Sequence, residues 1–106
     1  MAQTGRLGVV ELAATTNTSV YQVATGLSAT VSVSFLNRNV ASATVRLALV
    51  DGAIGALVDE DYIEFDVVIP PNGILERGGI VLSSEESVIV YSDVATVNVR
   101  VHGFEE

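Results

Sequence analysis

The chain of 106 residues contains no cysteine, no lysine and a single histidine, His102. Without cysteine there is no disulfide scaffold, thiolate zinc site, iron–sulfur cluster or thiol nucleophile. Without lysine, Schiff-base chemistry and the lysine of a phosphate-binding P-loop are excluded. One histidine cannot supply a two-histidine metal site within one chain. The missing residue types therefore exclude many metal centres and several kinds of covalent catalysis.

Positive charge is scarce as well. Five arginines stand against 13 aspartates and glutamates, so the formal net charge is −8. Because each contact with a phosphate needs a cation, this balance argues against nucleic acids and anionic membranes as partners. No apolar run approaches 18 residues, so we expect no membrane-spanning helix. Met1–Leu12 lacks the basic region and long apolar run of a secretory signal, and we expect none there.

Apolar residues make up 49% of the chain, and valine is the commonest residue, at 19 of the 106 positions. Side chains branched at Cβ fit a pleated sheet better than a helix. Apolar and polar residues alternate in four long runs, Ala29–Phe35, Thr44–Leu49, Tyr62–Ile69 and Thr96–His102. This period of two predicts strands with one buried face. The expected core residues are Val31, Val33, Phe35, Val45, Leu47, Leu49, Ile63, Phe65, Val67, Val97, Val99 and Val101.

Shorter strands are expected at Ser19–Val23, Gly79–Leu82 and Ser87–Tyr91, with a weaker one at Leu7–Leu12. Turn-forming residues separate the runs, most clearly in Pro70-Pro71-Asn72-Gly73. About seven or eight short strands at this spacing predict an all-β protein. We expect residues 18–106 to form a single antiparallel β-sandwich, either Ig-like or jelly-roll-like.

The N-terminal segment, residues 1–17, differs from the rest and is expected to be an arm or an edge strand. Gly5 and Gly8 loosen its backbone, and Ala13-Ala14-Thr15-Thr16 offers little surface to bury. We expect residues 2–16 to pack on a neighbouring subunit or shell more than on their own domain, and to be mobile in the free protein. The candidate anchors at such an interface are Leu7, Val9, Val10 and Leu12.

The polar faces of the expected strands carry few charges. Strands exposed in a free monomer usually carry charged residues that prevent edge pairing. Faces with so few charges are typical of an assembled subunit, and we predict a homo-oligomer. Arg46 and Arg100 either pair with Glu64 or Asp66 across strands or reach a partner chain. The short outer residues are Thr30, Ser32, Ser34, Thr44, Ala48, Thr96 and Asn98.

No arrangement of residues in the sequence indicates catalysis. Asp59, Glu60, Asp61, Glu64 and Asp66 form the densest acidic stretch and could offer oxygen ligands to Ca²⁺, but they lack the spacing of an EF-hand. A solvated loop and strand face is the favoured interpretation. His102 falls on the polar side of the last strand, without a nucleophile or second base beside it. We therefore predict no catalytic, cofactor-binding or metal-binding residue, and a protein that is not an enzyme.

Several short segments also resemble a known group of proteins. Together they cover nearly the whole chain and consist of turns and strands, not catalytic motifs. The resemblance is to small virion structural proteins of tailed bacteriophages, commonly from aquatic and cyanobacterial phages. The segments are Gly5–Gly8, Leu12–Thr18, Val20–Val23, Asn37–Asn39, Val45–Ala48, Asp61–Glu64, Leu75–Gly79 and Val97–Glu106.

The resemblance implies a virion component that is assembled in the host cytoplasm. A capsid decoration or cement protein, which stabilises the shell by contacts between subunits, is the expected role. Its partners would be the major capsid protein or another virion protein, and by analogy with decoration proteins we expect the homo-oligomer to be a trimer. A tail or appendage subunit is the nearest alternative. A host-surface or glycan-binding module, using the loops Asp51–Asp61 and Ser83–Glu86, is a further one.

Overall fold

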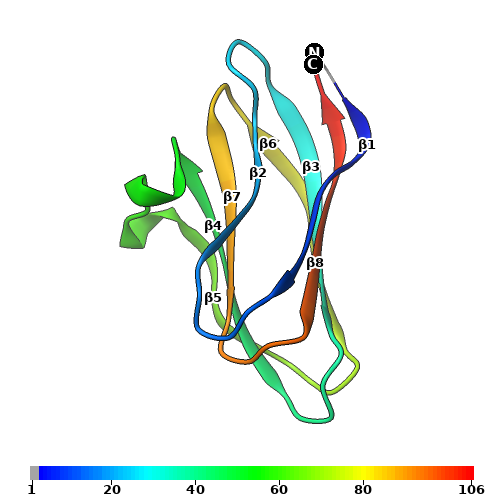
Figure 1. The fold of residues 1–106 in the computed structure, drawn as a ribbon. Helices are drawn as coiled ribbons and strands as arrows, with labels where there is room; N and C mark the ends of the chain where they lie inside the picture. The colour runs from blue at the N-terminus through cyan, green and yellow to red at the C-terminus, as the bar shows by residue number, and fades with distance from the viewer. Residues whose placement is uncertain (1–2) are drawn as a thin grey trace.

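The computed structural model describes residues 3–106 and contains two antiparallel sheets of four strands each, packed face to face (Figure 1). The strand order is β1-β8-β3-β6 in the first sheet and β2-β7-β4-β5 in the second. The predicted β-sandwich is confirmed. The elements are β1 (Thr4–Leu12), β2 (Thr18–Gln22), β3 (Ala29–Asn37), β4 (Ala43–Asp51), the 3₁₀ turns η1 (Ile54–Ala56) and η2 (Asp59–Asp61), β5 (Tyr62–Ile69), β6 (Ile74–Leu82), β7 (Glu86–Ser92) and β8 (Val97–Glu105).

The pairing of strands identifies the topology. β1 pairs with β8, β2 with β7, β3 with β6 and β4 with β5, all antiparallel. These four nested pairs are those of one long hairpin. When this long hairpin folds over on itself to form two sheets, β3 also pairs with β8 and β4 with β7. This arrangement is the eight-stranded jelly roll, which is one of the two topologies expected from the sequence.

The core lies between the sheets, where the alternating residues of the central strands meet. Val31, Val33 and Phe35 of β3 are buried, as are Val45 and Leu47 of β4 and the three valines 97, 99 and 101 of β8. Leu49, Ile63 and Val67 are partly buried and pack against this core. Full burial of one such side chain stabilises the fold by about 1.5–3 kcal/mol.

The prediction that Phe65 is buried is wrong, because 54% of its surface is exposed. Two bulges interrupt β5 opposite β4, between the pairs Val45–Val67, Leu47–Glu64 and Ala48–Tyr62. Asp66 lies in the first bulge and has a φ of 54°, in the left-handed region. An extra residue shifts the side chains to the opposite face of a strand. Phe65 therefore points outward although Ile69, further along the same run, is buried.

The N-terminal segment is an edge strand, not an arm. β1 pairs with β8 from Thr4 to Leu12, Leu12 is buried, and Leu7 and Val10 pack against the core. A Cβ atom on Gly8 would lie 2.3 Å from the carbonyl oxygen of Val20, so glycine permits the close approach of β1 to the chain of β2. The expectation that this segment packs mainly on a neighbour is thus corrected for the described residues; residues 1 and 2 lie outside them.

Edge strands and central strands differ in regularity. The pairings that involve the edge strands β1, β2, β5 and β6 each contain a register shift. The pairings between central strands, β3 with β8 and β4 with β7, contain none. Bulges at a sheet edge twist it away from further pairing. The four edges are therefore poor templates for adding a strand from another chain.

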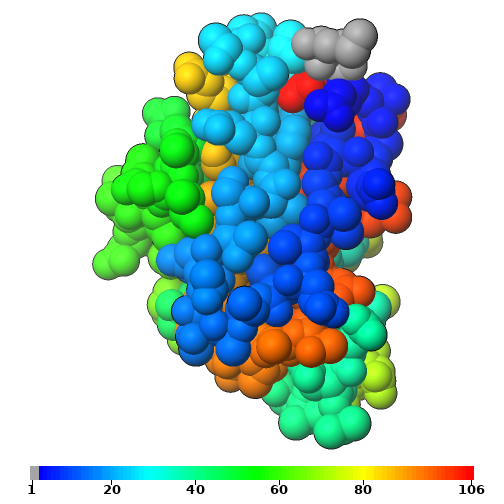
Figure 2. Space-filling view, viewed as in Figure 1, coloured from blue at the N-terminus to red at the C-terminus, as the bar shows by residue number. Residues whose placement is uncertain are grey.

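The outer face of the second sheet has a small core of its own. Ala48, Val50 and Ile89 point outward from β4 and β7 but are buried, with Leu57 and Tyr62 packed against them. Leu57 belongs to the connection between β4 and β5, whose two 3₁₀ turns stand out as a separate lobe in green (Figure 2). Ala48, expected on a smooth exposed face, is thus covered by this connection.

Candidate interaction surface

On the outer face of the first sheet, the residues predicted from the sequence to point outward remain at least partly exposed. Along β8, residues 98, 100, 102 and 104 alternate with the buried valines, and along β3 residues 30, 32, 34 and 36 do the same. The register places them in rows across the sheet. Arg100 lies between Val9 and Ser34, His102 between Arg6 and Ser32, and Phe104 between Thr4 and Thr30.

Two open hollows lie on this face, and Arg100 lines both. One, of about 340 Å³, is bordered by Gly5, Arg100, His102, Gly103 and Phe104, and we call it the β1–β8 hollow. The other, of about 330 Å³, is bordered by residues that include Val9, Ser34, Leu36 and Asn98. Gly103 is needed here because a Cβ atom would lie 2.1 Å from the carbonyl oxygen of Thr30. The missing side chains of two glycines and the short side chain of Ser34 leave space beside the long side chain of Arg100.

The cationic side chains divide into two groups. Three arginines form ion pairs: Arg38 with Glu11 at 2.8 Å, Arg46 with Asp66 at 2.7 Å and Arg77 with Glu64 at 2.8 Å. In residues 3–106, Arg6 and Arg100 form none. Both lie on the outer face of β1 and β8, beside His102. Nδ1 of His102 is shielded from solvent and has no hydrogen-bond partner within the described part of the chain.

Two carboxylates on the same sheet face are engaged by other residues. Glu76, in the same row as Arg100, accepts a hydrogen bond of 3.0 Å from the hydroxyl of Ser34. Glu11 accepts one of 2.8 Å from Arg38. The exposed apolar residues Val9, Leu36 and Phe104 lie on the same face. The surface therefore combines unpaired positive charge with apolar side chains, although the whole chain is acidic.

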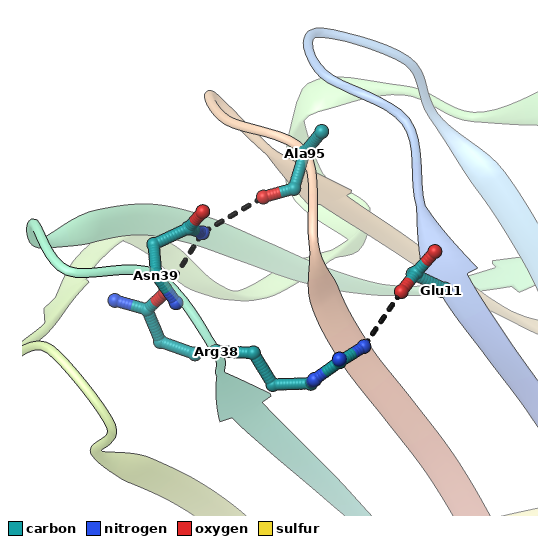
Figure 3. Close-up of polar contacts among 5 residues, drawn as sticks. Glu11, Arg38, Asn39 and Ala95 are labelled. Atoms are coloured by element: carbon teal, nitrogen blue, oxygen red, sulfur yellow. Dashed lines mark hydrogen bonds and ion pairs between the residues drawn. The ribbon is translucent and has the colours of Figure 1, made fainter.

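Polar contacts at one end of the sandwich fix the ends of β1 and β3. The side-chain nitrogen of buried Asn37 donates to the carbonyl oxygens of Ala41 and Ile69, at 2.9 and 3.1 Å. Its oxygen accepts from Asn39, whose side chain donates to Ala95 (Figure 3). Arg38 reaches Glu11 at the end of β1 (Figure 3). These contacts join three turns and the first strand, and their role is structural.

An aromatic and arginine cluster lies on the outer face of the second sheet. The guanidinium of Arg46 lies 4.2 Å from the ring centre of Phe65 and 4.6 Å from that of Tyr91, distances typical of cation–π contacts. Tyr62 meets Phe65 edge to face at 5.0 Å. The hydrogen bond to Asp66 raises the pKa of Arg46 above its ordinary value. Asp66 is one of the two carboxylates expected to pair with Arg46 or Arg100; Glu64, the other, pairs with Arg77.

The acidic stretch from Asp59 to Asp66 does not converge on one point. Asp61 accepts a hydrogen bond from the backbone of Val58 at 2.9 Å, while Glu64 and Asp66 turn to different arginines. The bulge at Asp66 separates two carboxylates that an unbroken strand would place on one face. Over residues 3–106, no three acidic or histidine side chains are grouped so that they could hold a metal ion.

A buried tyrosine–carboxylate pair joins the two sheets. The hydroxyl of Tyr21 on β2 donates to the carboxylate of Glu105 on β8 at 2.6 Å, and both residues are buried. This hydrogen bond, with a further one from the backbone of Ala24, lowers the pKa of Glu105, although burial opposes the shift. Burial and the same hydrogen bond raise the pKa of Tyr21. The pair stabilises the protonated tyrosine beside the charged glutamate.

The six interface candidates from the sequence fall into different environments. Leu12 is buried, Leu7 and Val10 pack on the core, and Arg46 is held by Asp66 and two rings. Only Val9 and Arg100 lie on the open outer face, directly opposite each other in register. The sequence analysis missed Arg6 and His102 as their neighbours. The shared phase of His102 and Arg100 is visible in the sequence, but placing Arg6 beside them requires the register between β1 and β8.

No protein-family model matches the chain, and neither the curated proteins nor the solved structures include a match to it. Within the part of the chain that the structure describes, no helix has the length and apolar character needed to cross a membrane. The proposals that follow therefore depend on the geometry and on the resemblance described above.

Proposed function

We propose that the chain is a non-enzymatic structural subunit of a tailed-bacteriophage virion that decorates the capsid and stabilises its shell. The observation that carries the proposal is the uncovered outer face of the first sheet. Its exposed residues include Val9, Phe104 and Val81, with 56%, 61% and 73% of their surfaces exposed, together with Leu36 and Ile74. These apolar side chains alternate with short hydroxyl-bearing ones, such as Thr30 between Val81 and Phe104.

The physical argument concerns what such a face does in a free subunit. Soluble monomers rarely expose large apolar patches, and patches rimmed by polar groups usually mark interaction sites. Because every edge pairing contains a register shift, addition of a strand from a neighbour is disfavoured, and the sheet face is the better surface for assembly. The partners proposed are the major capsid protein, or another virion protein, and further copies of the chain.

The jelly roll supports the proposal in a weaker way. Capsid subunits use this architecture, and so do lectins and cupins, so the fold by itself does not define a function. What separates these roles is which surface makes the contacts. A cement protein would use a broad face, while a lectin or an enzyme would use a pocket lined by polar groups that hold its ligand.

Locating the protein in virions tests the proposal. Virions from the source that encodes the chain are purified, and the protein is found by immunogold electron microscopy with antibodies against it. Label over the capsid surface is the expected result. Label restricted to the tail would favour the alternative of a tail or appendage subunit. Absence from purified virions would contradict both.

A matched pair of variants tests whether the first sheet makes the contact. Val81→Asp places a charge on the outer face of the first sheet, and Val68→Asp does so at a similarly exposed position of β5 in the second sheet. Capsids that lack the protein are incubated with each variant, and bound protein is measured after sedimentation. Val81→Asp is expected to lose binding while Val68→Asp keeps it. Equal binding by both would place the contact elsewhere.

The aromatic and arginine cluster favours a second candidate function, binding of glycans on a host surface. Phe65 and Tyr91 offer rings on which a sugar could stack, and Asp66 offers a hydrogen-bond acceptor for hydroxyl groups beside them. A glycan array probed with the native chain and with Phe65→Ala tests this. Specific binding that is lost in Phe65→Ala would support the glycan-binding module over the capsid subunit. No binding by either protein would contradict it.

A further inference from the structure

The unpaired arginines of the first sheet have a segment of complementary charge elsewhere in the chain. Residues 54–61, which contain η1 and η2, form what we call the acidic corner. Asp59 and Glu60 are exposed there, and neither forms an ion pair within residues 3–106. Asp61 is engaged with the backbone of Val58. Ile54 and Val58 are exposed apolar residues of the same segment.

We propose that the β1–β8 hollow binds the acidic corner of a second copy of this chain. Arg100 and His102 line the hollow, and Arg6 lies opposite His102 on β1. A carboxylate from Glu60 or Asp59 pairs with the guanidinium groups of Arg100 and Arg6, and Val58 contacts exposed Phe104. The inference rests on the proposed function in taking the chain to be an assembling subunit, and it names one partner and one contact.

Charge distribution is the main argument for a second copy as the occupant. Residues 51–66 contain six of the 13 acidic residues of the chain and no basic one. The two arginines that have no carboxylate partner in residues 3–106 both lie on the outer face of β1 and β8. Each copy therefore presents one surface with unpaired negative charge and one with unpaired positive charge. Complementary charges of this kind steer association and fix its orientation.

The positions of the two surfaces determine the form of the assembly. The acidic corner stands out on the side of the molecule away from β1 and β8 (Figures 1 and 2). A contact between opposite sides of identical subunits is head to tail, and it closes into a ring when the rotation between neighbours allows it. The proposed contact uses side chains on a sheet face and a loop, which agrees with the bulged, poorly pairing edges.

Sedimentation velocity of the purified chain over micromolar to millimolar concentrations tests the contact. The native chain is expected to associate reversibly, and Arg100→Gln to weaken association about 30-fold or more, as expected for loss of one partner of a charge pair that is buried in the contact. Arg46→Gln removes the same charge from an arginine on the outer face of the second sheet, outside the hollow, and is expected to associate like the native chain. Circular dichroism checks that both variants remain folded.

Complementary charge reversals make the test specific. Arg100→Glu and Glu60→Arg are each expected to abolish self-association, whereas a 1:1 mixture of the two associates, because each variant keeps one intact half of the contact. A native chain that stays monomeric at millimolar concentration would contradict the proposal, and so would native-like association of Arg100→Gln or a mixture that stays monomeric. A monomer that still binds capsids would refute this contact and leave the capsid role standing.

Discussion

The outer faces of the two sheets differ in what covers them. On the second sheet, Ala48, Val50 and Ile89 are buried beneath the connection between β4 and β5, and Arg46 is held between two rings and paired with Asp66. On the first sheet, nothing in the described chain covers Val9, Phe104 or Arg100. Both faces arise from the same alternation of residues, so the pattern alone does not decide which face is open.

The length of one connection accounts for the difference. Ten residues, 52–61, join β4 to β5, enough for two 3₁₀ turns that return to the sheet, whereas only residues 70–73 join β5 to β6. A loop that folds back on its own domain buries apolar surface and removes it from water. In the described chain no such loop covers the outer face of the first sheet, so its apolar side chains remain exposed to solvent. We call the outer face of the second sheet, which is partly covered while Phe65 and Val68 stay exposed, the closed face, and the outer face of the first sheet the open face.

The largest effect is expected from removing the first strand of the open sheet. Deletion of residues 2–16 takes away the pairing of β1 with β8 and exposes the core to which Leu7, Val10 and Leu12 belong. We expect the shortened chain not to fold, as measured by far-ultraviolet circular dichroism and thermal melting. Val9→Ala, in the same strand but exposed, is expected to melt close to the native chain. An unchanged melting midpoint for the deletion variant would show that the segment is an arm that does not stabilise the domain.

Substitution of two phenylalanines compares the stability contributed by a core residue with that contributed by a residue on the closed face. Phe35→Ala is expected to lower the free energy of unfolding by about 3–5 kcal/mol, because Phe35 is fully buried. Phe65→Ala removes a half-exposed ring and one cation–π contact, so a loss of about 1 kcal/mol is expected. Urea denaturation measures both. Equal losses would show that the bulge in β5 is misplaced and that Phe65 belongs to the core.

The contact between the sheets at Tyr21 and Glu105 predicts a pH dependence. Because the pKa of Glu105 is lowered from its ordinary value of 4.5, its charged form stabilises the fold at pH values above 4.5. This stability is lost as the pH falls from 4.5 through the pKa of the folded state. The raised pKa of Tyr21 stabilises the fold below about pH 10, and this stability is lost as the pH rises further.

Tyr21→Phe removes the hydrogen bond between these residues. It is expected to cost about 1.5–3 kcal/mol at neutral pH, the range for a hydrogen bond to a charged group. The variant should also lose less stability than the native chain at both pH extremes. Thermal melts between pH 3 and pH 11 measure this. Parallel pH profiles for the two proteins would contradict the assignment.

The smallest effect is expected from Arg46 on the closed face. Arg46→Gln removes an ion pair with a partly exposed carboxylate and two ring contacts, and we expect a loss of about 0.5–1 kcal/mol in urea denaturation. Because Arg46 lies outside the proposed contact between copies, the variant should associate like the native chain. Loss of association in Arg46→Gln would show that the outer face of the second sheet, and not that of the first, makes the assembly contact.

Sequence reasoning recovered the strands and most of the core because alternation is a local property. The buried sets in β3 and β8 are the ones that the alternation predicts. Phe65 was misplaced because the positive φ of Asp66 and the resulting bulge leave the hydrophobic pattern of the run intact. A bulge depends on the partner strand, which the run itself does not reveal.

The candidate surface was less predictable than the fold. Val9 and Arg100 were identified as interface candidates, but so were Leu7, Val10 and Leu12, which pack inward. The extra residue at Leu7 changes the phase of β1, so that Arg6 and Val9 both face outward. The grouping of Arg6, Arg100 and His102 depends on long-range pairing between the two ends of the chain, which local patterns do not contain.

Nuclear magnetic resonance of the chain on dilution tests most directly whether the open face of the first sheet is the one that assembles. Backbone amide shifts are compared between about 1 mM and 10 μM protein, a range that covers weak association. The account predicts concentration-dependent shifts at Arg6, Arg100, His102 and Phe104 and at residues 58–60, with none around Arg46 and Tyr91. Shifts confined to the second sheet, or spectra unchanged over the whole range, would contradict it.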